Sequence, residues 1–332
     1  MHRMAIRIIR VASDCSGWCS EVQAAKALGQ PIEHVFASDT AKPVQKLVEK
    51  YFKPKHLFND AADEKPVGLP QVDVYVCGWP CQSFSKAGLK RGIEDTRGTV
   101  VLELLQFIST HTPNSFIIEN VPNLVSQFTE VFESIIEELQ CESTYHVTWD
   151  IRDSRVHGGL PQTRQRVYIV GIKKSSMLVE FTWPKPRACK QLKDILSRKK
   201  GTKADYESLS QTFKKNVDKT NDLLISKGMN PFDVDAIYNV GGSKPHWTLD
   251  ACPTITASRG SQRAFWSSKR FRLLDVNEMM KLQGAQPSTF TNWDKVISTT
   301  QMGRIIGNAM TVPIVEDIMA AILVSLGVRD QA

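Results

Sequence analysis

A cysteine and a glutamate that could act together in covalent catalysis each follow a short apolar segment. Cys81 comes directly after Pro80, a few residues beyond the apolar stretch 72–77, and Glu119 follows the largely apolar run 115–118. Because proline fixes its own φ and makes the preceding residue extended, we expect a rigid approach to the Cys81 thiol. Burial would raise the pKa of Glu119, so that it could give or share a proton at neutral pH. This pair indicates attack of a partly ionised thiol on carbon.

Two arginines and a turn with a later aspartate extend the set of candidate residues. Arg164 and Arg166 are two positions apart, so on a strand they would share one face and could bind carboxylate, phosphate or carbonyl groups. The turn around Gly17 follows the first apolar stretch but holds a single glycine, which is a weak nucleotide-binding signal. Asp39 lies 22 residues after Gly17, a spacing that suits a carboxylate accepting hydrogen bonds from ribose. An N-cap role for Asp39 explains its position equally well.

Strands and helices are predicted to alternate through the first 172 residues. The predicted strands are 6–12, 34–38, 72–77, 116–119, 145–149 and 167–172, and the predicted helices are 21–28 (with Ser20 as N-cap), 41–50, 99–109 and 128–139. This alternation predicts an α/β fold with a doubly wound, mostly parallel sheet. Ligands bind such a sheet beyond the carboxyl ends of its strands, which is where the candidate residues fall.

Beyond residue 172 the hydrophobic pattern weakens and the charge becomes uneven. We predict a catalytic and cofactor-binding domain at 1–172, a smaller, irregular domain at 173–290, and a C-terminal segment at 291–332 that returns to the first domain. The whole net charge of +7 lies in residues 185–230, with twelve basic and five acidic side chains. A local basic block typically binds a polyanion, nucleic acid first and acidic lipid second, although a solvated loop is the alternative.

The order of these motifs resembles that of the DNA (cytosine-5)-methyltransferase family over nearly the whole chain. Pro80-Cys81-Gln82, Glu119-Asn120-Val121 and Gln162-x-Arg164-x-Arg166 are similar to its nucleophile, glutamate and arginine motifs. Further similar motifs are Asp95-x-Arg97-Gly98, Pro253-Thr254-Ile255-Thr256, the set Arg272, Glu278, Leu282, Gln283 and Gly284, and Gly307-Asn308. The first motif departs from the family pattern, because Cys15 replaces a phenylalanine and Cys19 and Ser20 replace glycines. Asp39 stands where the family mostly has glutamate, and Ala309 replaces a serine.

The resemblance implies a Rossmann-like S-adenosylmethionine-dependent methyltransferase domain with a target-recognition domain. It implies methyl transfer from S-adenosyl-L-methionine to carbon 5 of a flipped cytosine in DNA, through a covalent bond between Cys81 and C6. The implied catalytic residues are Cys81, Glu119, Arg164 and Arg166. The implied cofactor-binding residues are Cys15, Ser16, Gly17, Trp18, Asp39, Thr40, Asp60, Pro80, Val100, Asn308 and Ala309. The implied DNA-binding residues are Ser83, Ser85, Lys86, Lys90, Arg91, Arg97 and Arg272.

Three other functions compete with this interpretation. An RNA (tRNA) cytosine-5 methyltransferase would keep the same catalytic motifs, but the Cys-Phe-Thr signature usual in its recognition region is missing from this sequence. A catalytically silent nucleic-acid-binding relative would explain the altered first motif. A nicotinamide-dependent oxidoreductase is disfavoured by the single glycine of the first turn and by the Pro-Cys-Gln sequence.

Composition and cysteine usage limit the remaining possibilities. The chain is 42% hydrophobic and 23% charged, values typical of a globular protein, and no long apolar window or secretory signal is found. Its seven cysteines indicate reduced thiols in an intracellular protein, cytoplasmic in a bacterial or viral setting and nuclear in a eukaryotic one. A zinc site formed by Cys15, Cys19, Cys77 and Cys81 is disfavoured by their spacing. We therefore expect a monomer that binds double-stranded DNA and neither metal nor membrane.

Overall fold

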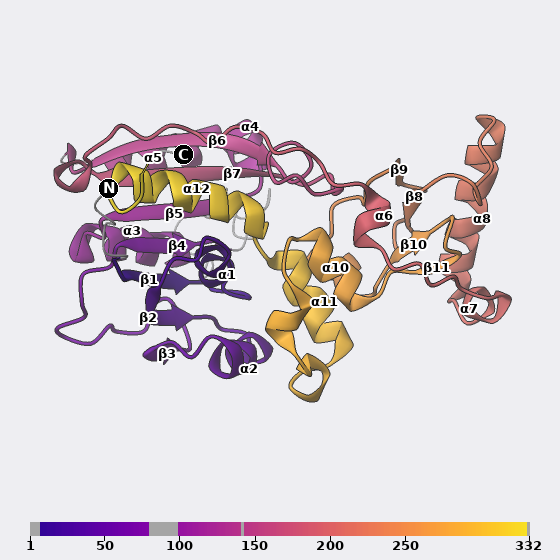
Figure 1. Cartoon of the computed structure of the whole chain (residues 1–332), viewed down its shortest axis with the longest axis horizontal. Coiled ribbons are helices and arrows are strands. Elements are labelled where there is room, and N and C mark those ends of the chain that lie inside the picture. Colours follow the sequence, from indigo (N-terminus) through magenta and orange to yellow (C-terminus); the bar gives the residue numbers. More distant parts are fainter. Residues whose placement is uncertain (1–6, 80–98, 141–142, 331–332) are drawn as a thin grey trace. The chain divides into compact units, whose positions relative to one another are not determined.

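The computed structural model describes residues 7–79, 99–140 and 143–330, which form two compact units (Figure 1). Unit 1 comprises Met1–Arg152, Gln165–Lys185 and Val312–Ala332, and unit 2 comprises Asp153–Arg164 and Pro186–Thr311. The short segment 153–164 thus belongs with unit 2, because its residues bond to carbonyl groups of that unit. The division of the chain at residues 172 and 290 stays a prediction.

Unit 1 is built on a seven-stranded sheet with the strand order β3-β2-β1-β4-β5-β7-β6. Its strands are β1 (Ile9–Asp14), β2 (Ile32–Ser38), β3 (His56–Phe58), β4 (Val74–Cys77), β5 (Ser115–Asn120), β6 (Tyr145–Asp153) and β7 (Gln165–Lys173). The pairs among β1 to β5 are parallel, and β7 runs antiparallel to β5. The predicted doubly wound, mostly parallel α/β fold is therefore confirmed. The sequence pattern did not reveal β3.

The helices of unit 1 are α1 (Ser20–Ala27), α2 (Lys42–Tyr51), α3 (Thr99–His111), α4 (Asn123–Gln127), α5 (Thr129–Gln140) and α12 (Val312–Ser325), with a 3-10 turn η4 (Lys174–Ser176). Phe36, Tyr75 and Phe107 pack against one another in its core, with their rings tilted or edge-to-face. The apolar helix α12, yellow in Figure 1, packs against α1. The predicted N-cap of α1 is wrong by one residue. Cys19 is the N-cap, and the Ser20 hydroxyl instead accepts a hydrogen bond from the indole of Trp18.

Unit 2 contains a small sheet with the strand order β11-β10-β8-β9, in which every pair is antiparallel. Its strands are β8 (Ala236–Asn239), β9 (Trp247–Leu249), β10 (Phe265–Ser267) and β11 (Arg272–Leu273); its helices are α6 (Leu192–Ile195), α7 (Lys203–Glu207), α8 (Gln211–Ser226), α9 (Ala257–Ser261), α10 (Val276–Leu282) and α11 (Thr299–Asn308), with the turns η5 (Pro287–Phe290) and η6 (Trp293–Lys295). The sequence pattern missed α8, which buries Val217 and Leu224 against Tyr238 and Trp266.

Glycine allows α9 and α11 to approach each other closely in unit 2. A Cβ atom at Gly307 would overlap with the backbone of Thr256 and Ala257, and one at Gly303 would overlap with the carbonyl of Gly260. Small residues are therefore required at this crossing. Across the described ranges of the chain, no single helix is long and apolar enough to cross a membrane, although the bent pair α11 and α12 together reaches that length.

Candidate active site

The carboxyl ends of β1, β4 and β5 lie side by side at one edge of the unit 1 sheet. Asp14 pairs in register with Cys77, and Cys77 with Ile118. At this edge Asn120 Nδ2 donates to the carbonyl of Trp79 over 3.3 Å. The end of β5 is thereby tied to the backbone that leads to the predicted nucleophile. Eight predicted site residues lie outside the described residues: Pro80, Cys81, Ser83, Ser85, Lys86, Lys90, Arg91 and Arg97.

Glu119 and Arg166 form an ion pair beside this edge. Arg166 Nε lies 3.1 Å from Glu119 Oε1, and their side chains are 14% and 9% exposed. Glu119 is near the end of β5 and Arg166 is near the start of the neighbouring strand β7, which explains how residues 47 positions apart meet. Because a buried carboxyl group is costly without a polar or charged partner, the guanidinium of Arg166 offsets the burial of Glu119.

Arg164 takes a different position from the one that its spacing predicts. The prediction that Arg164 and Arg166 share one face of a strand is wrong, because β7 begins at Gln165. The buried guanidinium of Arg164 donates from Nη1 to the Ile255 carbonyl at 2.8 Å and from Nη2 to the Ala309 carbonyl at 2.8 Å. These bonds join the segment after β9 to the end of α11, so Arg164 positions backbone within unit 2.

The turn between β1 and α1 is joined to the end of β2 through Asp39. The Asp39 carboxylate accepts hydrogen bonds from the N–H of Gly17 at 3.1 Å and from the N–H of Ala41 at 2.9 Å. Burial raises the pKa of Asp39, the two N–H groups oppose this shift, and the nearby charge of Asp60 adds to it. The Ser16 N–H also donates to the Ser38 carbonyl at 2.9 Å. The half-buried carboxylate thus lies where a ligand bound at the first turn would meet it.

A buried network of polar side chains lies under this turn, and the sequence alone did not predict it. Asp14, at the end of β1, accepts a hydrogen bond from Tyr75 Oη at 2.7 Å and another from the Ser38 hydroxyl. Lys65 Nζ lies 3.5 Å from the same carboxylate and 4.5 Å from the ring centroid of Phe58. Burial raises the pKa of Asp14, while Lys65 and the two hydroxyl groups lower it. Asp14 could have been singled out from the sequence, because a carboxylate at the end of a buried strand needs a partner. Lys65 could not have been predicted as that partner, because it lies far from Asp14 in the sequence.

The other predicted cofactor residues are distributed over both units. Cys15 is half-buried with a φ of 51°, Trp18 is fully buried, Thr40 is exposed, and Asp60 accepts from the Ala62 N–H at 3.1 Å in the turn after β3. Val100 is half-buried in α3. Unit 2 holds Asn308, exposed at the end of α11, and Ala309, buried directly after it. The structure therefore brings together Ser16, Gly17 and Asp39, with the Asp60 charge near enough to affect Asp39.

Arg272, predicted to contact DNA, is largely buried inside unit 2. Its Nη1 and Nη2 atoms bind the two carboxylate oxygens of Glu278 at 2.8 and 2.6 Å, and its Nε donates to the Lys199 carbonyl at 2.9 Å. The side chains of Arg272 and Glu278 are only 8% and 2% exposed. This arrangement links α10 to the segment that precedes α7, and the DNA contact stays a prediction.

A pocket of about 400 Å³ opens in unit 2 among charged side chains. Arg155, Lys190 and Lys193 line it together with Asp235 and Asp250. Two of its three basic residues belong to the basic block 185–230. The basic block therefore contributes to a concave surface that carries both basic and acidic side chains.

Sequence comparison matches most of the chain to one family. The model of the family described as C-5 cytosine-specific DNA methylase matches residues 10–324. The type II methyltransferase M.NgoBI of Neisseria gonorrhoeae is 30% identical over 286 residues, which cover 85% of this chain and 84% of the relative. The type II methyltransferase M.Bsp6I of Bacillus sp. (strain RFL6) is 28% identical over 305 residues, covering 89% and 92%.

Solved structures share the fold at low sequence identity. The Entamoeba histolytica methyltransferase EhMeth superimposes with a TM-score of 0.65 at 17% identity, covering 96% of this chain and 98% of the other. The S. pombe Dnmt2 methyltransferase gives a TM-score of 0.63 at 17% identity, covering 95% and 98%. The Rossmann-like methyltransferase fold is confirmed by these similarities.

Proposed function

Because the chain belongs to the C-5 cytosine-specific DNA methylase family and is thus a DNA (cytosine-5) methyltransferase, we propose that it methylates an extruded cytosine of double-stranded DNA through a covalent bond to Cys81. The observation that supports this most directly is the Glu119–Arg166 pair at the edge to which the Cys81 segment leads. A carboxyl and a guanidinium beside a nucleophile are what addition to a pyrimidine ring requires.

We propose S-adenosyl-L-methionine as the methyl donor, because the family requires a donor and the first turn fits one. Asp39 keeps carboxylate lone pairs for ribose hydroxyls after accepting from Gly17 and Ala41. Ser16 and Gly17 lie at the carboxyl end of β1, where an open α/β sheet binds its ligand, and Asp60 adds a second carboxylate nearby. When bound, the donor supplies an electrophilic methyl group.

In the proposed reaction the Cys81 thiolate adds to C6 of cytosine, which breaks the ring's aromaticity and makes C5 nucleophilic. Glu119 holds N3 and the exocyclic amine and protonates N3 as charge develops there, while Arg166 binds the O2 carbonyl. C5 takes the methyl group as the sulfur–methyl bond of the donor breaks, and S-adenosylhomocysteine leaves. C5 then gives its proton to solvent water, the Cys81–C6 bond breaks to return the thiolate, and N3 returns its proton to Glu119. Arg164 belongs to unit 2, where its guanidinium holds the backbone carbonyls of Ile255 and Ala309.

C6 of a stacked cytosine cannot be reached, so the proposal includes rotation of the base out of the duplex. The segment 82–98, which lies outside the described residues, carries Lys86, Lys90, Arg91 and Arg97 for phosphate contacts in this proposal. The basic block 185–230 and the charged pocket of unit 2 support a further set of phosphate contacts. The DNA affinity should therefore fall steeply as salt is raised.

RNA is the second candidate substrate. The fold is shared with two Dnmt2 methyltransferases, and the catalytic residues alone do not separate DNA from RNA. The test is incubation with a labelled methyl donor and either unmethylated duplex DNA or RNA, followed by bisulfite sequencing. We expect 5-methylcytosine in DNA and none with Cys81→Ser. Transfer to RNA alone would replace the DNA proposal, and turnover of Cys81→Ser near that of the wild type would refute the role of Cys81.

A further inference from the structure

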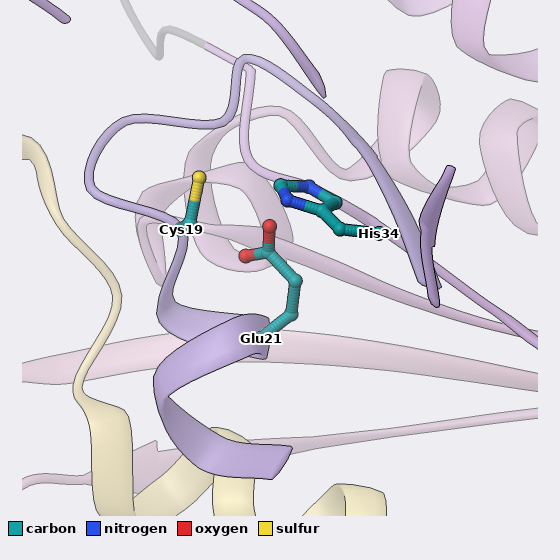
Figure 2. A group of neighbouring side chains, drawn as sticks. All are labelled: Cys19, Glu21 and His34. Atoms are coloured by element: carbon teal, nitrogen blue, oxygen red, sulfur yellow. The ribbon is translucent and has the colours of Figure 1, made fainter. Parts of the chain in front are cut away.

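Three side chains of metal-binding chemistry, none of them used in the proposed reaction, meet in the interior of unit 1. One ligand atom each of Cys19, Glu21 and His34 lies within 4.8 Å of the other two, and all three residues are buried. Figure 2 shows the Cys19 thiol, the Glu21 carboxylate and the His34 imidazole turned toward one another, the first two from the start of α1 and the third from β2. We propose that these residues form a buried site for one divalent transition-metal ion, most suitably Zn²⁺.

The ligand chemistry selects the kind of ion. Thiolate and imidazole bind Zn²⁺ and exclude Mg²⁺ and Ca²⁺, which prefer oxygen. Atoms bound to one tetrahedral zinc ion lie about 3.5 Å apart, so the present limit of 4.8 Å closes with movements of about 1 Å or less on each side chain. One thiolate, one carboxylate and a neutral imidazole also balance the charge of the dication, which removes the main cost of burial.

The surroundings of these residues supply the contacts that metal ligands usually have. Ser13 Oγ lies 2.7 Å from Glu21 Oε1, which fixes the carboxylate. His34 Nδ1 lies 3.5 Å from the Phe52 carbonyl, and His34 Nε2 has no hydrogen-bond partner among the described residues. Histidine ligands typically hold one nitrogen against a carbonyl and offer the other to the metal. An imidazole nitrogen is thus available in the interior at this place.

Cys19 is the N-cap of α1 and has a φ of 51°, in the left-handed region. A bound metal ion would join the start of α1 to β2 and so hold the turn that contains Ser16 and Gly17 in place.

No metal was expected from the sequence, because the spacing of Cys15, Cys19, Cys77 and Cys81 disfavours zinc, and only the fold brings Cys19, Glu21 and His34 together. The site does not depend on methyl transfer, and its test needs no substrate. The protein is stripped of metal with a chelator, then titrated with Zn²⁺ in competition with a chromophoric chelator, and with Co²⁺ for absorption spectroscopy. We expect one ion per chain and a sulfur-to-cobalt charge-transfer band.

Cys19→Ala and His34→Ala should each weaken zinc binding more than about 100-fold, since even residues that only support a ligand cost 10–100-fold. The matched controls Cys189→Ala and His246→Ala change exposed residues and should bind as the wild type does. Glu21→Gln keeps the shape of the side chain and serves if an alanine variant fails to fold. A wild-type chain that binds no zinc or gives no cobalt–sulfur band would overturn the site, as would unchanged affinity in folded Cys19→Ala or Glu21→Gln.

Discussion

The replacement Arg272→Met tests whether Arg272 supports unit 2 or contacts DNA. It would leave the Glu278 carboxylate, 2% exposed, without the guanidinium that binds both of its oxygens. Removing one partner of a buried ion pair costs about 3–5 kcal/mol. Because about 1 kcal/mol lowers the Tm of a unit of this size by about 2–4 °C, we expect a fall of about 10 °C by calorimetry.

The double variant Arg272→Met/Glu278→Gln removes the buried charge and serves as the control. Glutamine can still accept from the N–H of Asp275 or Ser197, which Glu278 now binds, so at least half of the lost Tm should return. Its DNA affinity should depend on salt as the wild type's does, whereas a lost phosphate contact would lower the slope of the log–log plot by about 1. A lower slope in the double variant, or an unchanged Tm in the single one, would refute the structural role.

The same pair has a defined pH dependence. Burial alone would raise the pKa of Glu278, but Arg272 and the N–H groups of Asp275 and Ser197 hold it below its ordinary value of 4.5. The stabilisation is therefore complete above pH 4.5 and is lost as the pH falls through the lowered value in the folded state. The free energy of unfolding of the double variant should lack this acid-dependent loss.

Three further predictions concern the cofactor turn, the catalytic edge and the helix crossing. Burial raises the pKa of Asp39 above 3.8. The affinity for S-adenosylmethionine, measured by calorimetry, should therefore begin to fall on acidification at a higher pH than the ordinary pKa of an aspartate would predict. Asp39→Asn should bind weakly at every pH, and a wild-type affinity that does not change with pH would contradict this. Asn120→Ala frees the Trp79 carbonyl and should lower kcat by about 10–100-fold through misplacement of the Cys81 segment, with an unchanged KM for the methyl donor; equal kcat would exclude it. Gly307→Ala places a Cβ atom against the backbone of Thr256 and Ala257. This overlap should lower the free energy of unfolding by about 1–3 kcal/mol. A Tm equal to that of the wild type would show that α9 and α11 can move apart to accept the methyl group.

The sheet of unit 1 was predictable because its strands and helices alternate with clear hydrophobic runs. β1, β2, β4 and β5 all fall within a few residues of their predicted ranges. β3 was missed because it is three residues long and only half-buried. In unit 2, α8 was missed because it lies in the basic block and only a few of its residues, such as Val217 and Leu224, are apolar and buried. Its sequence therefore shows only a weak helical pattern of apolar residues.

The candidate site was predictable where motif residues lie next to strand ends, and less so where distant residues meet. Glu119 and Arg166 were singled out from their neighbours in sequence, and the structure pairs them. The rule that residues two apart on a strand share one face failed for Arg164, because Arg164 lies just before β7. Its side-chain direction is set by hydrogen bonds such as that to the Ile255 carbonyl, not by the alternation of the strand. Lys65 beside Asp14, and His34 beside Cys19, depend on folding of separate segments and leave no local pattern.

The most direct measurement offers the protein, loaded with S-adenosylmethionine, a duplex in which 5-fluorocytosine replaces cytosine throughout the target sites. The fluorine at C5 cannot leave as a proton does, so the sulfur–carbon bond should persist and yield a protein–DNA band on a denaturing gel, absent with Cys81→Ser. If a folded and cofactor-loaded protein yields no such band on any duplex tried, covalent catalysis by Cys81 is contradicted.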